Sequence, residues 1–353
     1  MTILFAILLF SLLIFVHELG HFAAAKLSGV QVNEFSMFMG PAIWKKQVGE
    51  TLYALRCIPI GGYCAMEGED GGSDNPRSFD KAAWWKRLII LAAGAAMNFI
   101  VGVLLMVIVY LPVQQAVVPV ISSFEEYCTV DGETGLQPGD RILEVDGEKI
   151  FVYPDFSLIL GMNGGDVHDL VVERNGQRVV LNDLRMEKHP VALPDGSTQM
   201  LYGMNFTIET LDIPARLEYA WNQSLNTVRL VRLSLQMIFN GQAGFSDMSG
   251  PVGIVQQMST VASESETRLD ALLNMLYFGG FIAINLAVMN LLPIPALDGG
   301  RIVGVLITTA VEGITKKKIN PKYEGYLHGA GMLLLLALMA VIMFKDIIYL
   351  FKG

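Results

Sequence analysis

The sequence predicts a polytopic α-helical membrane protein with about four transmembrane helices and one folded β-rich domain outside the membrane. Of its 353 residues, 52% are hydrophobic and 17% are charged, whereas soluble domains carry about 25% charged residues. Three runs contain no Asp, Glu, Lys or Arg: residues 88–124, 271–297 and 325–344. Each run reaches the roughly 18–20 residues with which a helix crosses a bilayer. This distribution excludes a soluble enzyme and a disordered chain.

The first span covers about residues 2–27. Its apolar stretch ends at Phe22-Ala23-Ala24-Ala25, which resembles the end of a signal peptide. However, no Lys or Arg precedes the apolar run, and the run exceeds the about 7–15 residues of a signal sequence. We therefore expect a retained transmembrane helix, followed by a second span over about residues 88–112.

Residues 30–64, between these two spans, carry a strand-like pattern. Apolar side chains recur mostly at every second position from Val32 to Met39, and a second run near Leu52 is bounded by glycines. The segment is too apolar for an ordinary loop. We expect a β-hairpin that lies against or dips into the membrane, where strand backbone is tolerated only inside protein or along a cavity. Residues 1–112 then form an N-terminal membrane part.

An acidic hydrophilic block follows the second span. Residues 125–212 hold 17 of the 34 acids and six of the 25 bases. Short strand-like runs alternate there with turn signals such as Asp146-Gly147 and Asn175-Gly176. We expect a small β-rich domain over residues 115–212, a lipid bilayer as partner of the chain, and no nucleic-acid partner. The three cysteines are too few for a disulfide framework and are expected to be inert thiols.

The C-terminal third returns to helical patterns. Residues 214–255 are predicted to form an amphipathic helix and a loop, because apolar residues from Leu217 to Leu235 recur at intervals of three and four. Residues 270–353 form a second membrane part. Its spans are predicted at about 271–292 and 326–350.

Positively charged residues predict the orientation in the membrane. Eight Lys/Arg lie between Lys26 and Arg87, and five between Arg301 and Lys322, including the triplet Lys316-Lys317-Lys318. Short loops rich in Lys and Arg stay cytoplasmic. We therefore expect a multi-pass protein of the cytoplasmic (inner) membrane, with both termini and the β-rich domain on the extracytoplasmic side.

His17-Glu18-Leu19-Gly20-His21, inside the first span, is an H-E-x-x-H sequence. On a helix both imidazoles lie on one face, one turn apart, and can bind one metal ion. Glu18 then lies beside the open position of the metal and can take a proton from water. A carboxylate in mid-membrane costs about 2.5–3.5 kcal/mol on insertion scales, so we expect a compensating interaction rather than a helix end at the interface.

A hydrolytic zinc site has three protein ligands and one open position. Asp298 is the first acid after the apolar stretch of the third span, and it is our choice for the third ligand. Glu34 is an alternative in the hairpin-like segment. The remaining histidines are less suitable, because two belong to the β-rich domain and one begins the fourth span: His168, His189 and His328.

The segment before Asp298 is unusual for a membrane helix. Asn290 is followed by Pro293 and Pro295, and each proline removes an N–H donor and disrupts a helix. The carbonyl groups that this frees must be satisfied at membrane depth. A substrate strand is one possible partner. The other interpretation is a kink in which Asn285 and Asn290 join neighbouring helices.

Together these motifs resemble the site-2 protease family of intramembrane zinc metalloproteases, and more narrowly its bacterial RseP/RasP type. The resemblance covers nearly the whole chain. The shared motifs, in chain order, are His17–His21, Pro59–Tyr63 at the end of a membrane-reentrant β-hairpin, Gly94–Asn98 as G-x-x-x-N, Gly135–Leu143 with Val145–Gly147 as in bacterial PDZ domains, Gly250–Ile254, and Asn290–Gly299.

The resemblance implies a role for each matching residue. His17, His21 and Asp298 would bind Zn²⁺, and Glu18 would be the general base. Transmembrane protein substrates, such as pre-trimmed anti-sigma factors or remnant signal peptides, would be cleaved toward the cytoplasmic side. Many RseP-type members carry two PDZ domains, whereas residues 115–212 have room for only one. This single PDZ-like domain would act as a gate for substrates or as a spacer. Residues expected to contact the substrate are Asn285, Asn290, Pro293, Pro295, Gly61 and Gly62.

Two other classes of function compete with a protease. In a membrane scaffold or adaptor, the PDZ-like domain binds protein termini and the metal site is structural or vestigial. Glu18 argues against this hypothesis, because a structural site needs no base. A transporter would also carry polar residues within the membrane, but the spans show no evident inverted repeat.

Overall fold

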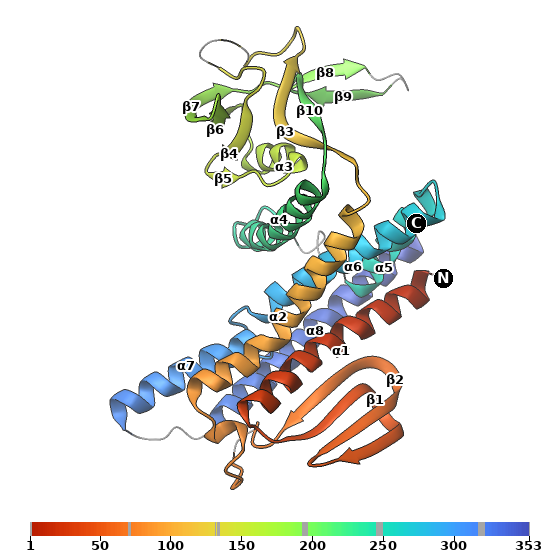
Figure 1. Ribbon diagram of the computed structural model, residues 1–353, viewed down its shortest axis with the longest axis vertical. Helices are drawn as coiled ribbons and strands as arrows, with labels where there is room; N and C mark the ends of the chain where they lie inside the picture. Colours follow the sequence, from red (N-terminus) through yellow and green to blue (C-terminus); the bar gives the residue numbers. More distant parts are fainter. Residues whose placement is uncertain are drawn as a thin grey trace. The chain divides into compact units, whose positions relative to one another are not determined.

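The computed structural model describes residues 2–69, 72–130, 132, 135–192, 197–244, 250–316 and 322–352 (Figure 1). These residues form two compact units. We call residues 1–106 and 227–353 the membrane unit, and residues 107–226 the β unit. The boundaries fall within two long helices, α2 (Trp84–Tyr110) and α4 (Ile213–Phe239).

Within the described part of the chain, four helices are long and apolar enough to cross a membrane, as predicted from the charge-free runs. The qualifying segments are Ile3–Ser28 of α1 (Thr2–Ser28), Trp84–Tyr110 of α2, Arg268–Asn290 of α6, and Gly325–Ile348 of α8 (Lys322–Lys352). Many of their large apolar side chains are exposed, for example Leu8 of α1 and Leu104 of α2, and in α8 most of them are. Such a surface is stable only against lipid, since water would leave it unburied.

Small residues let these helices approach one another closely. A Cβ added at Gly20 of α1 would collide with the carbonyl oxygen of Ala93 in α2. At Gly102 of α2 it would lie 2.5 Å from the Ile284 side chain of α6. Glycines at such positions are typical of packed membrane helices, because lipid offers no hydrophobic force to drive association and close van der Waals contact must supply it.

The hairpin predicted over residues 30–64 is a small sheet of two long, folded strands, β1 (Val32–Val48) and β2 (Thr51–Met66). Residues 34–37 of β1 pair with two stretches of β2, so that Glu34 faces both Ala65 and Leu52. The paired stretches therefore lie in the order 62–66, 32–37, 51–56 and 42–48. The first of these stretches is at the edge of the sheet.

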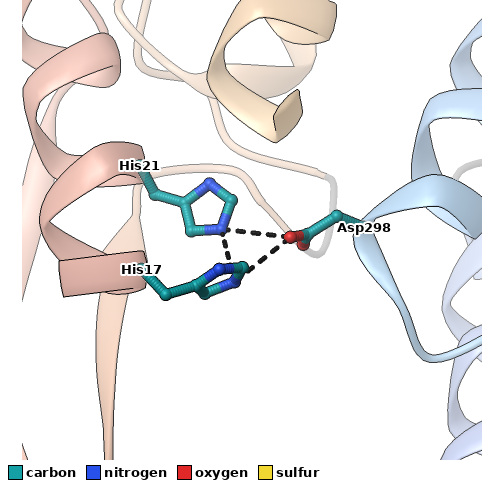
Figure 2. A group of neighbouring side chains, drawn as sticks. All are labelled: His17, His21 and Asp298. Carbon is teal, nitrogen blue, oxygen red and sulfur yellow. Dashed lines mark hydrogen bonds and ion pairs between the residues drawn. The ribbon is translucent and has the colours of Figure 1, made fainter. Parts of the chain in front are cut away.

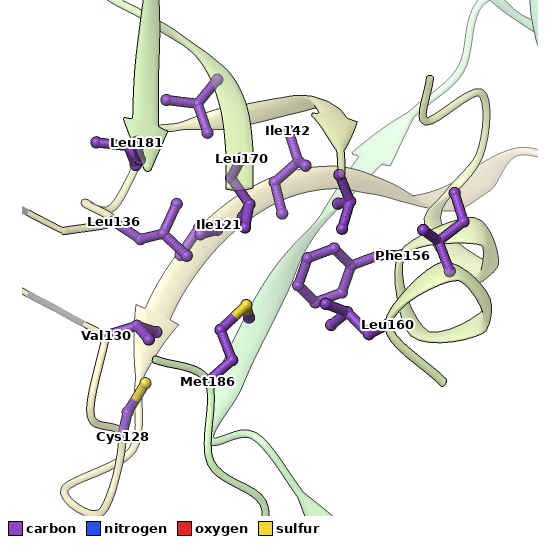
Figure 3. Close-up of a cluster of buried hydrophobic side chains, with 13 residues drawn as sticks. Ile121, Cys128, Val130, Leu136, Ile142, Phe156, Leu160, Leu170, Leu181 and Met186 are labelled. Atoms are coloured by element: carbon purple, nitrogen blue, oxygen red, sulfur yellow. The ribbon is translucent and has the colours of Figure 1, made fainter. Parts of the chain in front are cut away.

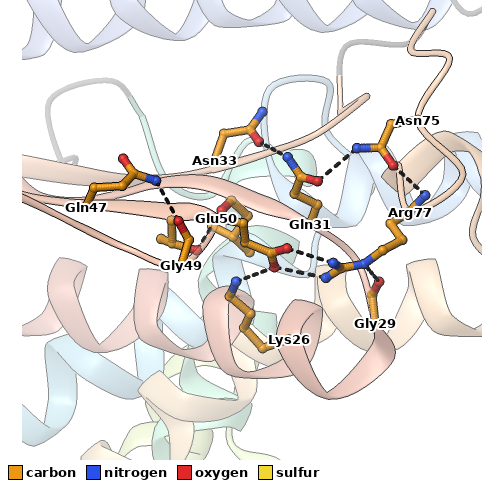
Figure 4. A network of polar contacts seen from close by, with 11 residues as sticks. Lys26, Gly29, Gln31, Asn33, Gln47, Gly49, Glu50, Asn75 and Arg77 are labelled. Carbon is orange, nitrogen blue, oxygen red and sulfur yellow. Dashed lines mark hydrogen bonds and ion pairs between the residues drawn. The ribbon is translucent and has the colours of Figure 1, made fainter.

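A polar cluster joins this sheet to the end of α1 (Figure 4). Glu50, in the turn between β1 and β2, accepts a hydrogen bond of 2.7 Å from Lys26 Nζ and two, of 2.7 and 2.9 Å, from the Arg77 guanidinium. Arg77 Nε also donates to the Gly29 carbonyl oxygen. The cluster fixes the point at which the chain leaves the first membrane helix and enters the sheet.

The β unit contains a six-stranded sheet with the order β10-β3-β4-β6-β7, in which β5 pairs with β4. A separate hairpin is formed by β8 and β9. The bounds are β3 (Gln115–Phe124), β4 (Arg141–Val145), β5 (Glu148–Lys149), β6 (Val167–Arg174), β7 (Gln177–Arg185), β8 (His189–Ala192), β9 (Thr198–Leu201) and β10 (Met204–Thr210). The unit is thus β-rich, as its alternating sequence pattern predicts.

One helix, α3 (Tyr153–Asn163), covers the core of this sheet (Figure 3). Phe156 and Leu160 of α3 pack with side chains of several strands, among them Ile121, Ile142 and Leu170. All five are at most 2% exposed, so the β unit has a hydrophobic core of its own.

Three helices lie outside the elements expected from the sequence: α3, α5 (Pro251–Glu264) and α7 (Asp298–Thr315). The N-terminus of α5 is capped by a side chain that is far away in the sequence. The buried Asp346 carboxylate of α8 accepts hydrogen bonds from the backbone N–H groups of Gly250 and Gly253, which offsets the cost of a charged group in a membrane helix. Of the triplet Lys316–Lys318, only Lys316 is among the described residues.

Candidate metal centre

His17 and His21 lie one turn apart on the same face of α1, as their spacing predicts. Their Nε2 atoms are 3.1 Å apart, and both rings point toward α7 (Figure 2). His21 is 7% exposed. Two imidazole nitrogens directed at one point inside a membrane protein are a ready pair of metal ligands.

Asp298, the first residue of α7, completes the group. Its Oδ2 atom lies 3.2 Å from His17 Nε2 and 3.3 Å from His21 Nε2 (Figure 2). The position at a helix N-terminus favours the ionised carboxylate, because the backbone N–H groups of the first turn are partly positive. Among the residues that the structure describes, these three form the one cluster of His, Cys, Asp or Glu with metal-binding geometry.

The loop between α6 and α7 places Asp298. α6 ends at Asn290, so the prolines break the helix rather than kink it. Ala296 adopts a left-handed conformation (φ 88°), and its N–H donates to Nδ1 of His328 in α8 at 3.1 Å. This hydrogen bond gives His328 a structural role that its position at a helix start did not predict.

Gly299 and Gly300 allow this loop to fold back on the start of α7. A Cβ at Gly299 would collide with the Leu292 carbonyl oxygen, and one at Gly300 with that of Ile294. The loop also satisfies part of its own backbone, since Leu292 O accepts from Ile294 N and Ile294 O accepts from Leu297 N. The carbonyl groups freed by the prolines are therefore already partly bonded within the chain.

The three ligand atoms fit a zinc ion. Tetrahedral coordination with bonds of about 2.0–2.1 Å places neighbouring ligand atoms about 3.3 Å apart, and the three observed separations are 3.1, 3.2 and 3.3 Å. The Oδ2 atom of Asp298 is buried and accepts no hydrogen bond. A cation between the three side chains would satisfy this oxygen, and the nitrogen–oxygen donor set suits Zn²⁺.

The ring orientation of His21 is fixed by a second contact. Its Nδ1 donates a hydrogen bond of 2.8 Å to the carbonyl oxygen of Ile90 in α2. With the proton on Nδ1, the Nε2 lone pair is free for a metal.

His17 has a corresponding partner in Asn98 of α2, which is 1% exposed. Asn98 Nδ2 lies 3.5 Å from His17 Nδ1, while Asn98 Oδ1 is buried without a hydrogen-bond partner. A rotation of the amide that exchanges these two atoms places Oδ1 where it accepts the Nδ1 proton of His17. This arrangement also leaves Nε2 of His17 free for a metal.

The face of α2 opposite the two histidines has no side chain at the point of contact. A Cβ at Gly94 would collide with Nε2 of His21 and would lie 2.7 Å from Cε1 of His17. Any larger residue at Gly94 would displace the imidazoles, so this glycine provides the space in which the rings converge.

Glu18 lies on α1 beside the edge of the β1–β2 sheet. A Cβ at Gly62 would be 3.7 Å from Glu18 Cγ and 3.0 Å from the Ser36 carbonyl oxygen. The neighbouring Gly61 has a φ of 80° and packs against Met39. Gly62 is thus close to Glu18, whereas Gly61 serves the turn of the strand.

Of the other residues expected to contact the substrate, one lies at the metal-binding cluster and the others lie around it. Asn290 is at the site, with Nδ2 at 3.5 Å from His17 Nδ1. Asn285 donates instead to the Phe281 carbonyl oxygen of its own helix. Pro295 packs against Gly331 of α8, and Pro293 belongs to the same loop.

The alternative ligands have other partners. Glu34 Oε1 pairs with Arg56 Nη2 at 2.6 Å. His168 pairs with Asp146 at 2.8 Å, and the ring of His189 packs against Tyr127. None of the three belongs to the metal-binding cluster among the described residues.

Several residues that shape this centre have no role assigned from the sequence: Asn98, Gly94 and His328. In the sequence, Gly94 and Asn98 belong to the G-x-x-x-N motif, which by itself assigns them no role. A buried Asn one turn from a helical Gly is a weak signal, because such pairs also join ordinary membrane helices.

Comparisons with known proteins agree with this centre. A model of peptidase family M50 matches residues 5–338. The chain is 33% identical to a protein from Clostridium acetobutylicum over 99% of this chain and 98% of the relative. It is 35% identical to one from Fusobacterium nucleatum over the full length of both. Both relatives are named as zinc metalloproteases.

A third relative is the zinc metalloprotease RasP of Shouchella clausii, which is 27% identical over 99% of this chain and 100% of the relative. The family match spans nearly the whole chain, and it includes all three residues of the metal-binding cluster. The chain therefore belongs to peptidase family M50, the site-2 protease family of zinc metalloproteases.

Proposed function

We propose that this protease hydrolyses peptide bonds within transmembrane segments of other membrane proteins. Pre-trimmed anti-sigma factors and remnant signal peptides are examples of such substrates. The observation that carries the proposal is the convergence of His17, His21 and Asp298 inside the membrane unit, with separations that match a tetrahedral zinc site.

In this proposal the Nε2 atoms of His17 and His21 and the Oδ2 atom of Asp298 hold the zinc ion. When bound, zinc supplies a Lewis acid and makes water a nucleophile at neutral pH. Glu18 accepts the proton that the attacking water loses and delivers it to the nitrogen of the leaving amine. Ile90 and Asn98 keep both imidazoles in the tautomer that leaves Nε2 free.

The depth of the centre supports cleavage within the bilayer. His17 and His21 precede Lys26, in the last turn of α1, by nine and five residues. At 1.5 Å per residue these intervals place the two histidines about 7–14 Å from the charged end of the helix. The reaction would therefore occur below the membrane surface, near the side on which the basic residues lie.

A helical substrate hides its carbonyl groups in its own hydrogen bonds and must unwind before cleavage. The edge of the β1–β2 sheet at residues 62–66 is suited to receive the unwound segment by strand addition. Gly62 offers no side chain that would keep this segment from Glu18. In this proposal Asn290 donates a hydrogen bond to the same segment, and the loop that contains Pro293 and Pro295 contacts it.

The β unit acts in this proposal as a PDZ-like gate on the extracytoplasmic side, where both termini also lie. It would admit only substrates whose ectodomains have already been trimmed. The acidic composition of residues 125–212 and the Lys/Arg content of the loops support this orientation.

The test is a cleavage assay on a transmembrane reporter combined with zinc analysis. Glu18→Gln should abolish cleavage and retain zinc, because Gln keeps the shape but cannot take a proton. Asp298→Asn should abolish cleavage and lower the zinc content, because it removes an anionic ligand. Glu34→Gln, which changes the alternative ligand, should leave the zinc content unchanged. Cleavage by Glu18→Gln at the normal rate would exclude Glu18 as the base.

A further inference from the structure

The turn after β2 carries a carboxylate that contacts both the sheet and α7. One oxygen of Glu69, Oε2, accepts a hydrogen bond of 3.3 Å from the backbone N–H of Met66, the last residue of the edge stretch 62–66. The other, Oε1, pairs with Nη1 of Arg301 in α7. A single side chain therefore joins the end of the sheet edge to the helix that begins with Asp298.

Both partners of this ion pair are near the metal-binding cluster. Arg301 follows Asp298 by three residues, so their side chains share one face of α7, one turn apart. Glu69 interacts electrostatically with Glu18. The side chains of Arg301 and Glu69 are only 21% and 22% exposed, so salt and water screen their attraction in part.

The turn that carries Glu69 is tightly packed. Gly68 has a φ of 69°, and a Cβ there would lie 2.6 Å from Asp80 Oδ1. The carbonyl oxygen of Glu67 accepts a hydrogen bond of 2.7 Å from the N–H of Phe79. Because these contacts fix the backbone of the turn, a movement of α7 away from the sheet would break the ion pair.

Apolar contacts also join α7 to the sheet. Val305 of α7 belongs to the same buried cluster as Cys64 and Met66 of β2. Hydrophobic attraction holds two elements together without fixing their register, because it has no preferred direction. A charge-assisted hydrogen bond does have a preferred direction and distance. The fold should therefore persist without the ion pair, whereas the alignment of α7 with the sheet edge should not.

We propose that Glu69 and Arg301 are positioning residues that decide which peptide bond of a substrate is cleaved. Main-chain hydrogen bonds hold a substrate strand in register with residues 62–66, and the ion pair holds these residues in register with Asp298. The two registers together bring one peptide bond of the strand to the metal-binding cluster. This inference rests on the proposed strand addition and adds to it the contact that selects the bond.

The test measures the rate and the position of cleavage of a transmembrane reporter, with the products identified by mass spectrometry. Arg301→Gln and Glu69→Gln should each lower kcat at least about tenfold, because a misplacement of about 1 Å costs up to about 100-fold. KM should stay within about twofold, since the main-chain hydrogen bonds to the edge remain. Part of the cleavage should move to the second bond on either side, because alternate residues of a strand point the same way.

Three control variants separate positioning from other effects. Arg301→Lys should keep the cleavage position of the parent, because an ammonium can replace a contact made through Nη1. Glu50→Gln removes the ion pair at the β1–β2 turn and should also keep it, which controls for lost stability. The double variant Glu69→Gln with Arg301→Gln leaves neither partner charged and should still cleave at displaced bonds. Zinc content should match the parent in all of these variants, since none changes a ligand.

A second readout of the contact does not depend on cleavage. Treatment of the Arg301→Lys protein with a carbodiimide should form an amide between the side chains at positions 301 and 69. A reagent of zero length joins only groups that are already in contact. The same treatment should give no such product when Glu69→Gln is also present. Peptide mass spectrometry distinguishes the two results.

Cleavage at the parent bond and at the parent rate in both glutamine variants would overturn this inference and leave the proposed hydrolysis intact. An effect of Arg301→Gln that Glu69→Gln does not share, or absence of the amide in the Arg301→Lys protein, would overturn it as well. Failure of the parent protein to cleave any transmembrane reporter would contradict the proposed function itself, and the inference with it.

Discussion

The neighbours of His17 determine which of its two ring nitrogens can bind a metal. Its Nε2 points toward Asp298, and its Nδ1 faces the amide groups of Asn98 and Asn290, each 3.5 Å away. An imidazole presents a lone pair at one nitrogen only if the other carries the proton. With the Asn98 amide rotated so that Oδ1 faces Nδ1, this oxygen accepts the Nδ1 proton and leaves Nε2 available.

Asn98 should contribute to zinc affinity although it is not a ligand. Asn98→Leu should weaken zinc binding by about 10–100-fold, which is the usual cost of removing the partner of a metal-binding histidine. Competition with a chelator of known affinity measures this change without any activity assay.

The matched control is Asn285→Leu, because Asn285 lies in another membrane helix and bonds within its own helix. Zinc affinity should be unchanged in this variant. Asn98→Asp, which keeps an acceptor oxygen, should recover most of the affinity. If Asn98→Leu and Asn285→Leu bind zinc equally well, Asn98 does not orient His17.

At the scale of elements, backbone geometry brings the ligands together. α1 carries two ligands through its own periodicity, whereas Asp298 reaches them only because α6 stops at Asn290 and the chain turns before α7. The turn depends on the prolines, on the contact of Ala296 with His328, and on glycines at which no Cβ fits. The ends of helices thus position the third ligand.

The cluster around Glu50 controls how the sheet joins α1, and it predicts a pH dependence (Figure 4). Hydrogen bonds from Arg77 and Lys26 lower the pKa of Glu50 from 4.5 to about 2. A carboxyl whose pKa is lowered by folding stabilises the fold above its unfolded pKa, and the contribution is lost as the pH falls toward the folded pKa. The relevant window is therefore from pH 4.5 down to about 2.

Thermal unfolding of the purified protein tests this prediction. At pH 7, Glu50→Gln should melt up to about 3 °C below the wild type, which is the size expected for a partly exposed ion pair. The difference should shrink across the window and vanish near its lower end. Glu266→Gln, at an exposed acid of the same unit, should show no such convergence. A constant difference at all pH values would contradict the assigned role of the Glu50 cluster.

At the scale of the whole molecule, the distribution of charge predicts the orientation in the membrane. The basic residues are concentrated between Lys26 and Arg87 and after Arg301, and the acids in residues 125–212. Short basic segments are retained in the cytoplasm, whereas a long domain is translocated regardless of its charge. The turn of the β1–β2 sheet and the β unit should therefore lie on opposite sides.

Labelling with a membrane-impermeant maleimide tests this orientation. In a Cys57→Ser background, a cysteine at the exposed Gln177 of β7 should react in intact cells. A cysteine at Gln47, exposed near the β1–β2 turn, should react only after the membrane is permeabilised. The opposite pattern would overturn the predicted sidedness and would leave the geometry of the metal-binding cluster unaffected.

The sequence by itself determined the features that depend on residues close together in the chain, namely the membrane helices, the pair of histidines and the β-rich domain. Charge-free runs of sufficient length predict four membrane helices because a bilayer has a fixed thickness, and the helix period places His17 and His21 on one face. The β-rich composition of the acidic block likewise predicts a sheet, since alternation and turn residues are local properties. The choice of Asp298 needed one further argument, namely that few acids lie near a span.

Only the tertiary structure decided which distant groups meet. The folding-back of β1 and β2, the contact of Ala296 with His328, the amide beside His17 and the contact of Phe206 in β10 with α3 all join segments far apart in the chain. No spacing in the sequence encodes such contacts, because they depend on how helices and strands pack as solid bodies. The helix α7 is not predicted from the sequence, because its glycine-rich start is typical of a loop. In the structure this start is helical and packs against residues 291–295 of the preceding loop.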